Sequence, residues 1–139
     1  NLSTQFRLPL RMSLLLASTY SFQYAVDVTD PEAKNDKDQI PYTPRHSGTV
    51  SGTLENPWVN VSYILTAVGD RYALPQNIDR NRIDSYIEQS ISINRDFRFR
   101  YFGLRLQGEL LNLANVNYDV IQYYPMPGRS WRLSICLSY

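Results

Sequence analysis

The chain has 139 residues, enough for one modest domain, and its net charge of +1 excludes a strongly basic nucleic-acid-binding surface. Its single cysteine, Cys136, excludes an internal disulfide framework, and the absence of any run of about 18 apolar residues excludes a transmembrane helix. Aromatic residues make up 13% of the chain, and 11 of them are tyrosines, which suits a β protein with extensive interfaces.

Strand-length segments of alternating residues run through the first half of the chain. We predict strands at 2–8, ending in a turn at Pro9, and at 11–26. Two more are expected at 45–54 and 58–67, on either side of the turn Glu55-Asn56-Pro57, because Asn and Pro both favour turns. In each segment a period of two places apolar residues on one face of the strand and polar or small residues on the other.

The second half continues the same pattern, with strands predicted at 84–93, 97–113 and 129–139 and a turn at 94–96. The closing strand is the clearest of these segments. One of its faces is entirely apolar and has an aromatic residue at each end, as in an outer-membrane strand of about 9–11 residues with aromatics at both interfaces. The residues of that face are Trp131, Leu133, Ile135, Leu137 and Tyr139.

The alternation also predicts which side chains face a polar lumen and which face lipid, because barrel strands alternate between the two. The expected lumen-facing residues are Arg105, Gln107, Glu109, Arg132 and Ser134. The expected lipid-facing residues are Leu14, Phe22, Val61, Leu104, Leu106, Leu133 and Leu137. Cys136 falls on the polar side, where we interpret it as a small inward-facing residue and not as a nucleophile.

Long polar loops at 27–44, 69–82 and 112–127 alternate with short turns near Pro9, at 55–57 and at 94–96. Strands of alternating direction place the long loops on one rim and the short turns on the other, as in outer-membrane barrels. A β-sandwich has no reason to alternate so strictly. We therefore predict an all-β fold, an antiparallel up-and-down meander with neighbouring strands paired in chain order.

Candidate chemistry is sparse. Asp36 and Asp38 have the spacing of oxygen ligands, but the Gly and the terminal Glu of a calcium loop are missing, so a solvated acidic loop is favoured. His46 has no second ligand nearby, and no Ser-His-carboxylate arrangement is evident. We predict no metal, no cofactor and no enzymatic activity.

Three tyrosines lie close to the expected mouth of a barrel. Tyr118, Tyr123 and Tyr124 each offer flat apolar area and a hydroxyl group, which would suit contact with a ligand. The alternative, which we favour, is that they belong to an aromatic girdle at the membrane interface.

Three segments, in the right order, resemble the late part of TonB-dependent outer-membrane receptors. Residues 39–46 (Gln-Ile-Pro-Tyr-Thr-Pro-Arg-His) resemble the loop-to-strand entry found there. Residues 110–118 resemble the Asn-Leu-Phe-Asn…Tyr segment, with Ala114 in place of the usual aromatic, and residues 124–131 are similar to the Pro-Gly-Arg entry to the final strand. The chain then ends on an aromatic, as these receptors do.

The resemblance implies a 22-stranded transmembrane β-barrel with an N-terminal plug, in the outer membrane of a Gram-negative bacterium. Such a receptor takes up an iron siderophore, haem, cobalamin or a glycan by active transport driven through the TonB complex. Residues 1–139 would form its last 6–7 strands, with the plug and the earlier strands absent. We expect a C-terminal fragment of the receptor; the alternative is a separate chain that completes a split barrel.

Two further expectations follow. The closing strand, from Trp131 to Tyr139, resembles the signal that the barrel-assembly machinery reads in outer-membrane proteins. The competing hypothesis is a soluble all-β carbohydrate-binding module that uses its tyrosines as a platform. That module would pack one face of its strands against a second sheet, whereas a receptor would expose the same face to lipid.

Overall fold

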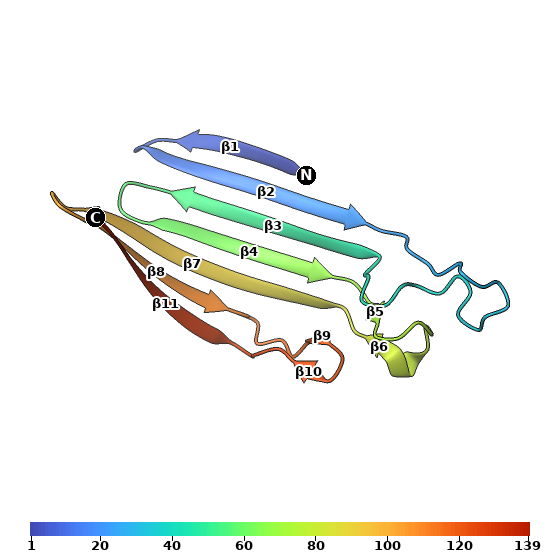
Figure 1. Cartoon of the computed structure of the whole chain (residues 1–139). Coiled ribbons are helices and arrows are strands. Elements are labelled where there is room, and N and C mark those ends of the chain that lie inside the picture. The colour runs from blue at the N-terminus through green and yellow to red at the C-terminus, as the bar shows by residue number, and fades with distance from the viewer.

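The computed structural model describes all residues, 1–139, and its main feature is an open antiparallel sheet of seven strands (Figure 1). The strands pair in chain order, so the predicted all-β meander is confirmed. The two outer strands each have a neighbour on one side only, and the sheet does not close on itself. In order, the strands are β1 (Leu2–Leu8), β2 (Met12–Phe22), β3 (His46–Glu55), β4 (Asn60–Val68), β7 (Tyr86–Arg98), β8 (Gly103–Leu111) and β11 (Ser130–Ser138).

The remaining elements are short and lie within two of the long connections. Residues 69–85 contain the two-stranded ribbon of β5 (Arg71–Tyr72) and β6 (Arg82–Ile83), with the 3-10 turn η1 (Asp79–Asn81) between its strands. Residues 112–129 contain a second ribbon, formed by β9 (Asp119–Ile121) and β10 (Tyr124–Pro125). No helix in the structure has the length and apolar character needed to cross a membrane.

Long and short connections occupy opposite ends of the sheet (Figure 1). The connections 23–45, 69–85 and 112–129 leave one end, and the connections 9–11, 56–59 and 99–102 leave the other. This asymmetry follows from the meander, because each strand reverses the direction of the one before it. The predicted alternation of loop lengths is confirmed.

The strand register gathers most apolar residues on one face of the sheet and most polar or small residues on the other, because directly paired residues of antiparallel neighbours lie on the same face. Leu15 and Ile64 are apolar exceptions on the polar face. One row of paired residues on the apolar face, from β2 to β11, is Leu14, Leu54, Val61, Ile93, Gly108 and Leu133. The adjacent row on the polar face is Leu15, Thr53, Ser62, Ser92, Glu109 and Arg132. Gln89 is a polar exception on the apolar face, where its side-chain oxygen accepts a 3.0 Å hydrogen bond from the Tyr63 hydroxyl.

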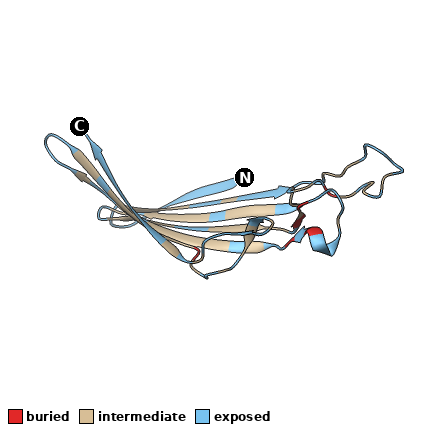
Figure 2. Ribbon diagram, turned by 60° about the horizontal axis from the view of Figure 1, so that its bottom comes forward, coloured by how far each residue is buried: buried red, intermediate tan, exposed pale blue.

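None of the residues in the seven strands is buried. The six buried residues of the chain all lie in the three long connections, at one end of the sheet (Figure 2). They are Gln39, Arg71, Ala73, Asn81, Ile83 and Asn112. The part of the molecule that resembles a protein interior is therefore the end that carries the long connections.

The predicted turn at 94–96 is wrong, because β7 continues through these residues to Arg98. Cross-strand partners hold them in the sheet: the Asn60 side chain donates to Asn94 at 3.2 Å, and Asp96 accepts two hydrogen bonds from Arg105. The actual turn lies at 99–102, where the Phe99 amide donates to the Phe102 carbonyl at 2.9 Å. The two phenylalanine rings stack with centroids 4.6 Å apart.

Other strand boundaries also differ from the prediction. The segment 11–26 forms a strand only over Met12–Phe22, and Val26 instead makes an isolated bridge with Gln39 in the following connection. The segment 97–113 is a strand only over Gly103–Leu111, because Asn112 has a φ of 50° and turns the chain. In both cases the alternation of residue types in the sequence continues past the end of the strand, so the predicted strand was too long.

Candidate functional site

Two groups of hydrogen-bonded polar side chains lie on the polar face of the sheet. Arg105 binds Asp96 through two nitrogens, at 2.6 and 3.0 Å, and Arg132 pairs with Glu109. Gln107 also donates to Glu109, at 2.9 Å. The first group joins β7 to β8 and the second joins β8 to β11, and together they include all four charged or amide residues predicted to face a lumen.

The same face continues with smaller polar groups toward β1. The Thr53 and Ser62 hydroxyls lie 3.0 Å apart, and the Ser13 hydroxyl donates to Glu55 at 2.9 Å. Ser134, the remaining residue predicted for this face, pairs in register with Gln107. The sheet thus presents a polar wall of hydroxyls and amides that ends, at β8 and β11, in paired charges.

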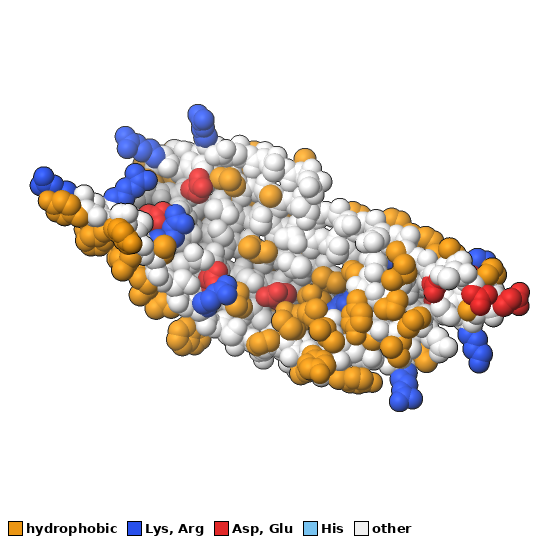
Figure 3. All heavy atoms as spheres, viewed as in Figure 1, with side chains coloured by type: hydrophobic (Ala, Val, Ile, Leu, Met, Phe, Trp, Pro, Cys, Tyr) orange, Lys and Arg blue, Asp and Glu red, His pale blue; other side chains and the backbone are white.

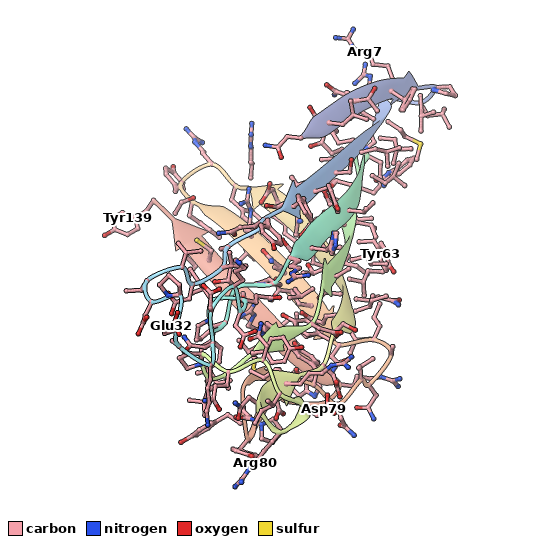
Figure 4. All side chains as sticks on the ribbon, turned by 90° about the vertical axis from the view of Figure 1, so that its right-hand side faces the viewer. Arg7, Glu32, Tyr63, Asp79, Arg80 and Tyr139 are labelled. Atoms are coloured by element: carbon pink, nitrogen blue, oxygen red, sulfur yellow. The ribbon has the colours of Figure 1, made fainter.

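The three long connections, 23–45, 69–85 and 112–129, contact one another and form a structure that we call the loop cap. The amide of Tyr42 donates to the carbonyl of Tyr72 at 2.7 Å, which joins the first connection to the second. The Gln122 side chain donates to the Arg80 carbonyl at 2.8 Å, which joins the third to the second. Seen from the cap end, Tyr63 projects from the apolar side of β4, whereas Glu32 of the first connection lies on the opposite side of the neighbouring strands (Figure 4).

Residues 110–118 and residues 124–131 interlock in the cap. Asn112 is 2% exposed, and its side chain bonds to the backbone of Val116 and to the carbonyl of Pro127. The Asn115 side chain accepts from the Arg129 amide at 2.8 Å. A Cβ atom at Gly128 would lie 2.7 Å from the Asn115 side-chain oxygen, so a larger residue there would displace that side chain.

Residues 39–46 dock on the second connection. Gln39 is buried, and its side-chain nitrogen donates to the carbonyls of Thr43 and, at 3.4 Å, Asp70. The preceding residue, Asp38, accepts from the Asn77 amide at 3.1 Å. Residues 39–46 therefore join the first two connections through the backbone of the second.

Arg71 occupies the centre of the cap and is 4% exposed. One terminal nitrogen, Nη2, donates to the carbonyls of Asp119 and Val120 at 2.6 and 3.2 Å. The other, Nη1, is buried without a partner. The guanidinium carbon lies 5.5 Å from the centroid of the Tyr86 ring, which is a cation–π contact. A single cation thus fixes the third connection to the polar face of β7.

The three tyrosines predicted near the mouth do not form one cluster. Tyr118 stacks on Tyr86 with centroids 4.1 Å apart, and partial burial, together with the nearby Glu88 carboxylate, raises the pKa of its phenol. Tyr123 and Tyr124 lie in the β9–β10 hairpin, where they are 76% and 71% exposed. Tyr118 therefore helps to hold the cap on the polar face, while the other two are free to contact a ligand or an interface.

The cap contains an open cavity of about 450 Å³ to which all three long connections contribute. Its walls combine a phenol ring, a guanidinium group and two aliphatic side chains. Such a lining can take a ligand with a flat apolar surface and a polar edge. The lining residues are Tyr42, Arg71, Val120 and Ile121.

Sequence analysis missed the residues that build this site. Arg71, Asn112 and Gln39 were not identified as candidates, because each is an ordinary polar residue in a loop. Of these three residues only Asn112 carries a conformational signal: Asn tolerates the left-handed backbone that a turn requires, and Asn112 and the nearby Asn115 have φ values of 50° and 53°. No group of three or more His, Cys, Asp or Glu side chains is arranged to hold a metal ion.

Comparisons with known proteins add no family to this description. No protein-family model matches the chain, and a search of the curated proteins finds no match.

Proposed function

We propose that the chain is the C-terminal part of a TonB-dependent outer-membrane receptor. In this proposal the seven strands are a section of the wall of a 22-stranded barrel, and the loop cap faces the outside of the cell. The support comes from three segments with residue patterns like those of the family, and from the fold that these segments adopt.

The observation that carries the proposal is the segregation of side chains over seven consecutive strands. A sheet with one apolar and one hydrated face suits a wall between lipid and an aqueous lumen. Under the proposal, Arg105, Gln107, Glu109 and Arg132 line the lumen, and Leu104, Leu106, Leu133 and Leu137 contact lipid. In water, the same apolar face would be an exposed patch much larger than soluble monomers tolerate.

The free edges of the sheet support the same proposal. Strands β1 and β11 run in the same direction, because the sheet has seven strands and each neighbour is antiparallel. Direct pairing of the two edges would therefore be parallel. An odd number of additional strands closes the sheet with antiparallel pairs only, and the even total matches bacterial outer-membrane barrels. A 22-stranded barrel meets this condition.

The proposal assigns partners and cargo by class. The remainder of the barrel and the plug, in the same or a second chain, would pair with both edges and fill the lumen. The TonB complex would act through the missing N-terminal part, and the cap cavity beside Tyr42 and Arg71 would contribute to binding a siderophore, haem, cobalamin or a glycan. We propose no catalytic role for the chain.

The soluble carbohydrate-binding module is the weaker hypothesis. It requires a second sheet packed against the apolar face, and the other two sheets of the structure are two-stranded ribbons within the long connections. The exposed Tyr123 and Tyr124 would be its best platform.

The orientation of the two faces can be tested by spin labelling of the full-length protein that contains this chain. In a Cys136→Ser background, each residue from 104 to 110 is replaced in turn by a spin-labelled cysteine, and the protein is reconstituted in vesicles. We expect collision with oxygen dissolved in lipid to be high at even positions and low at odd positions, with the reverse order for a water-soluble nickel reagent. The physical reason is the two-residue period of a strand between lipid and lumen.

A matched series in the loop cap, at 119–124, provides the control, since these residues should favour the water-soluble reagent throughout. Uniformly low oxygen collision at 104–110, as expected for a face covered by protein, would contradict the proposal.

The closing strand would also carry the assembly signal, formed by Trp131, Leu133, Ile135, Leu137 and Tyr139. These residues lie on the apolar face of β11 or directly after it, and β11 is an edge strand. Edge pairing with the barrel-assembly machinery would be fixed in register by alternate side chains. We expect deletion of Tyr139 to lower the amount of heat-modifiable folded barrel in outer membranes much more than Tyr123→Ala does. Equal amounts would limit Tyr139 to an interfacial role.

A further inference from the structure

The hairpin between β7 and β8 extends beyond the neighbouring turn at the end opposite the loop cap. Strand β4 begins at Asn60, which pairs with Asn94 of β7, so residues 95–102 have no neighbour on the β4 side. Residues 95–98 pair only with β8, which in turn pairs with β11, and residues 99–102 form the turn. We call residues 95–102 the hairpin tip.

The hairpin tip combines cations with exposed aromatic rings. Its sequence is Arg-Asp-Phe-Arg-Phe-Arg-Tyr-Phe, and the one acidic residue, Asp96, is already bound to Arg105. None of Arg95, Arg98 and Arg100 forms a salt bridge. The aromatic side chains of Phe99, Tyr101 and Phe102 are all exposed, with Tyr101 at 78%.

Arg95 is the informative residue of the tip, because it lies on the apolar face of the sheet. It pairs in register with Leu106, and its guanidinium carbon lies 4.8 Å from the centroid of the Phe97 ring on the same face. Arg100 makes a similar contact with Tyr101, at 5.5 Å. Each guanidinium group thus lies near an aromatic ring, and neither forms a salt bridge within the chain.

The outermost short turn, between β1 and β2, adds positive charge to the same end of the sheet, with the β3–β4 turn between it and the hairpin tip. Arg7 and Arg11, on either side of the turn between β1 and β2, also form no salt bridge. Arginine side chains gather at this end of the molecule, whereas carboxylates are prominent at the tip of the first long connection (Figure 3). The end with the short turns is therefore a cationic rim bordered by an apolar face.

We infer that the hairpin tip binds the anionic headgroups of phospholipids at the membrane surface on the side of the short turns. This inference rests on the proposed function, which places the apolar face in lipid. An arginine on that face, close to its edge, extends its charge toward the headgroups while its stem stays in the apolar layer. The flanking aromatic rings fit the same interfacial layer. Phosphate groups in the lipid supply the anion that the chain does not.

The test compares lipid preference in the full-length protein reconstituted in vesicles of phosphatidylcholine, with or without phosphatidylglycerol as a minor component. The readout is the relative affinity for spin-labelled phosphatidylglycerol over spin-labelled phosphatidylcholine at the protein surface. We expect the wild type to prefer phosphatidylglycerol, with a contribution of up to about fivefold for each arginine near the surface. The triple variant Arg95→Gln, Arg98→Gln, Arg100→Gln should lose most of that preference, and high salt should weaken it in the wild type.

A matched control removes the same charge from the loop cap: Lys34→Gln, Lys37→Gln, Arg80→Gln should keep the wild-type preference. Arg95→Lys retains the charge and should keep most of the lipid preference. This variant keeps the inference testable if the triple variant folds poorly. A triple variant that inserts and shows the wild-type preference would overturn the inference. The inference would also be overturned if inorganic phosphate or poly-glutamate, added at the same total negative charge as the phosphatidylglycerol, abolished the preference. The surface would then suit a free anion or an acidic protein.

Failure of the inference and failure of the proposed function are distinguishable. A protein that inserts into both kinds of vesicle without lipid preference contradicts the inference alone. A protein that inserts into neither contradicts the membrane proposal itself.

Discussion

In the seven-stranded sheet, backbone hydrogen bonds join neighbouring strands and no residue is buried, whereas in the loop cap buried polar side chains bind the backbone directly. Of the 74 backbone–backbone hydrogen bonds in the chain, 57 lie within regular elements, which leaves the long connections with few ladder bonds. All four buried polar residues are in the cap, and each donates to a carbonyl there. They are Gln39, Arg71, Asn81 and Asn112.

The difference follows from what each region lacks. The backbone N–H and C=O groups of the sheet are hydrogen-bonded to neighbouring strands except at its two edges. The stability of the sheet therefore depends on what covers its apolar face and what pairs with its edges. The cap has irregular backbone, and its carbonyls need donors wherever they are shielded from water. The sheet is therefore sensitive to the chemistry of its faces, and the cap is sensitive to a few side chains that no other residue replaces.

The largest expected effect is on the apolar face. Leu106→Arg should destabilise the reconstituted barrel by about 2–4 kcal/mol if Leu106 lies near the middle of the bilayer, because a charge must enter hydrocarbon. Gln107→Arg, one residue away on the polar face, should have a much smaller effect. Urea unfolding in vesicles measures both. Equal losses would remove the distinction between the two faces.

In the cap, we expect Asn112→Ala to have the largest effect. It removes three hydrogen bonds and places an alanine at a φ of 50°, for a total loss of about 2–3 kcal/mol. Asn112→Gly tolerates the backbone conformation but lacks the hydrogen bonds, so it should lose less. Asn117→Ala, at an exposed position in the same connection, should be nearly neutral. A full recovery of stability in Asn112→Gly would assign the effect to the backbone alone.

Arg71→Met should cost about 1–2 kcal/mol of local stability in the cap. Two carbonyls, those of Asp119 and Val120, lose their donor, but the buried and unpaired Nη1 is removed at the same time, which offsets part of the loss. Hydrogen exchange of residues 119–125 should rise, while exchange in β8 and β11 stays unchanged. Arg80→Met, at an exposed cap position, is the control. Equal exchange in both variants would show that Arg71 does not hold the third connection.

The smallest expected effect concerns pH at the first connection. The Thr29 hydroxyl and amide, followed by Asn35, donate to Asp27 and lower the pKa of its carboxyl group below the usual 3.8. A carboxyl with a lowered folded-state pKa stabilises above its unfolded-state pKa, and that contribution is lost as the pH falls through the folded-state value. The protection of residues 27–38 against hydrogen exchange, taken relative to the intrinsic exchange rate at each pH, should therefore decrease only below about pH 4.

Asp27→Asn should show the faster exchange of this segment already at neutral pH and should flatten its pH dependence. Glu32→Gln, in the same segment but without a hydrogen bond from its side chain, should behave as the wild type does. An unchanged pH profile in Asp27→Asn would exclude Asp27 as the titrating group.

Within the sheet, local sequence was sufficient for most of the fold. A strand has a fixed two-residue period, so the residues of each face could be identified without knowing the neighbouring strand. The alternation of long and short connections likewise indicated which would share a rim. The turn at 94–96 was wrong because Asn and Asp favour turns in isolation, yet here Asn94 and Asp96 find partners on adjacent strands.

Sequence by itself therefore determined the two faces of the sheet, the order of its strands and the asymmetry of its rims. The cap was decided only by tertiary structure. Arg71 and Asp119 are 48 residues apart, and Asp38 and Asn77 are 39 apart, so no local pattern links them. Their contacts exist because the sheet brings the three long connections to one end, where irregular backbone must find side-chain donors.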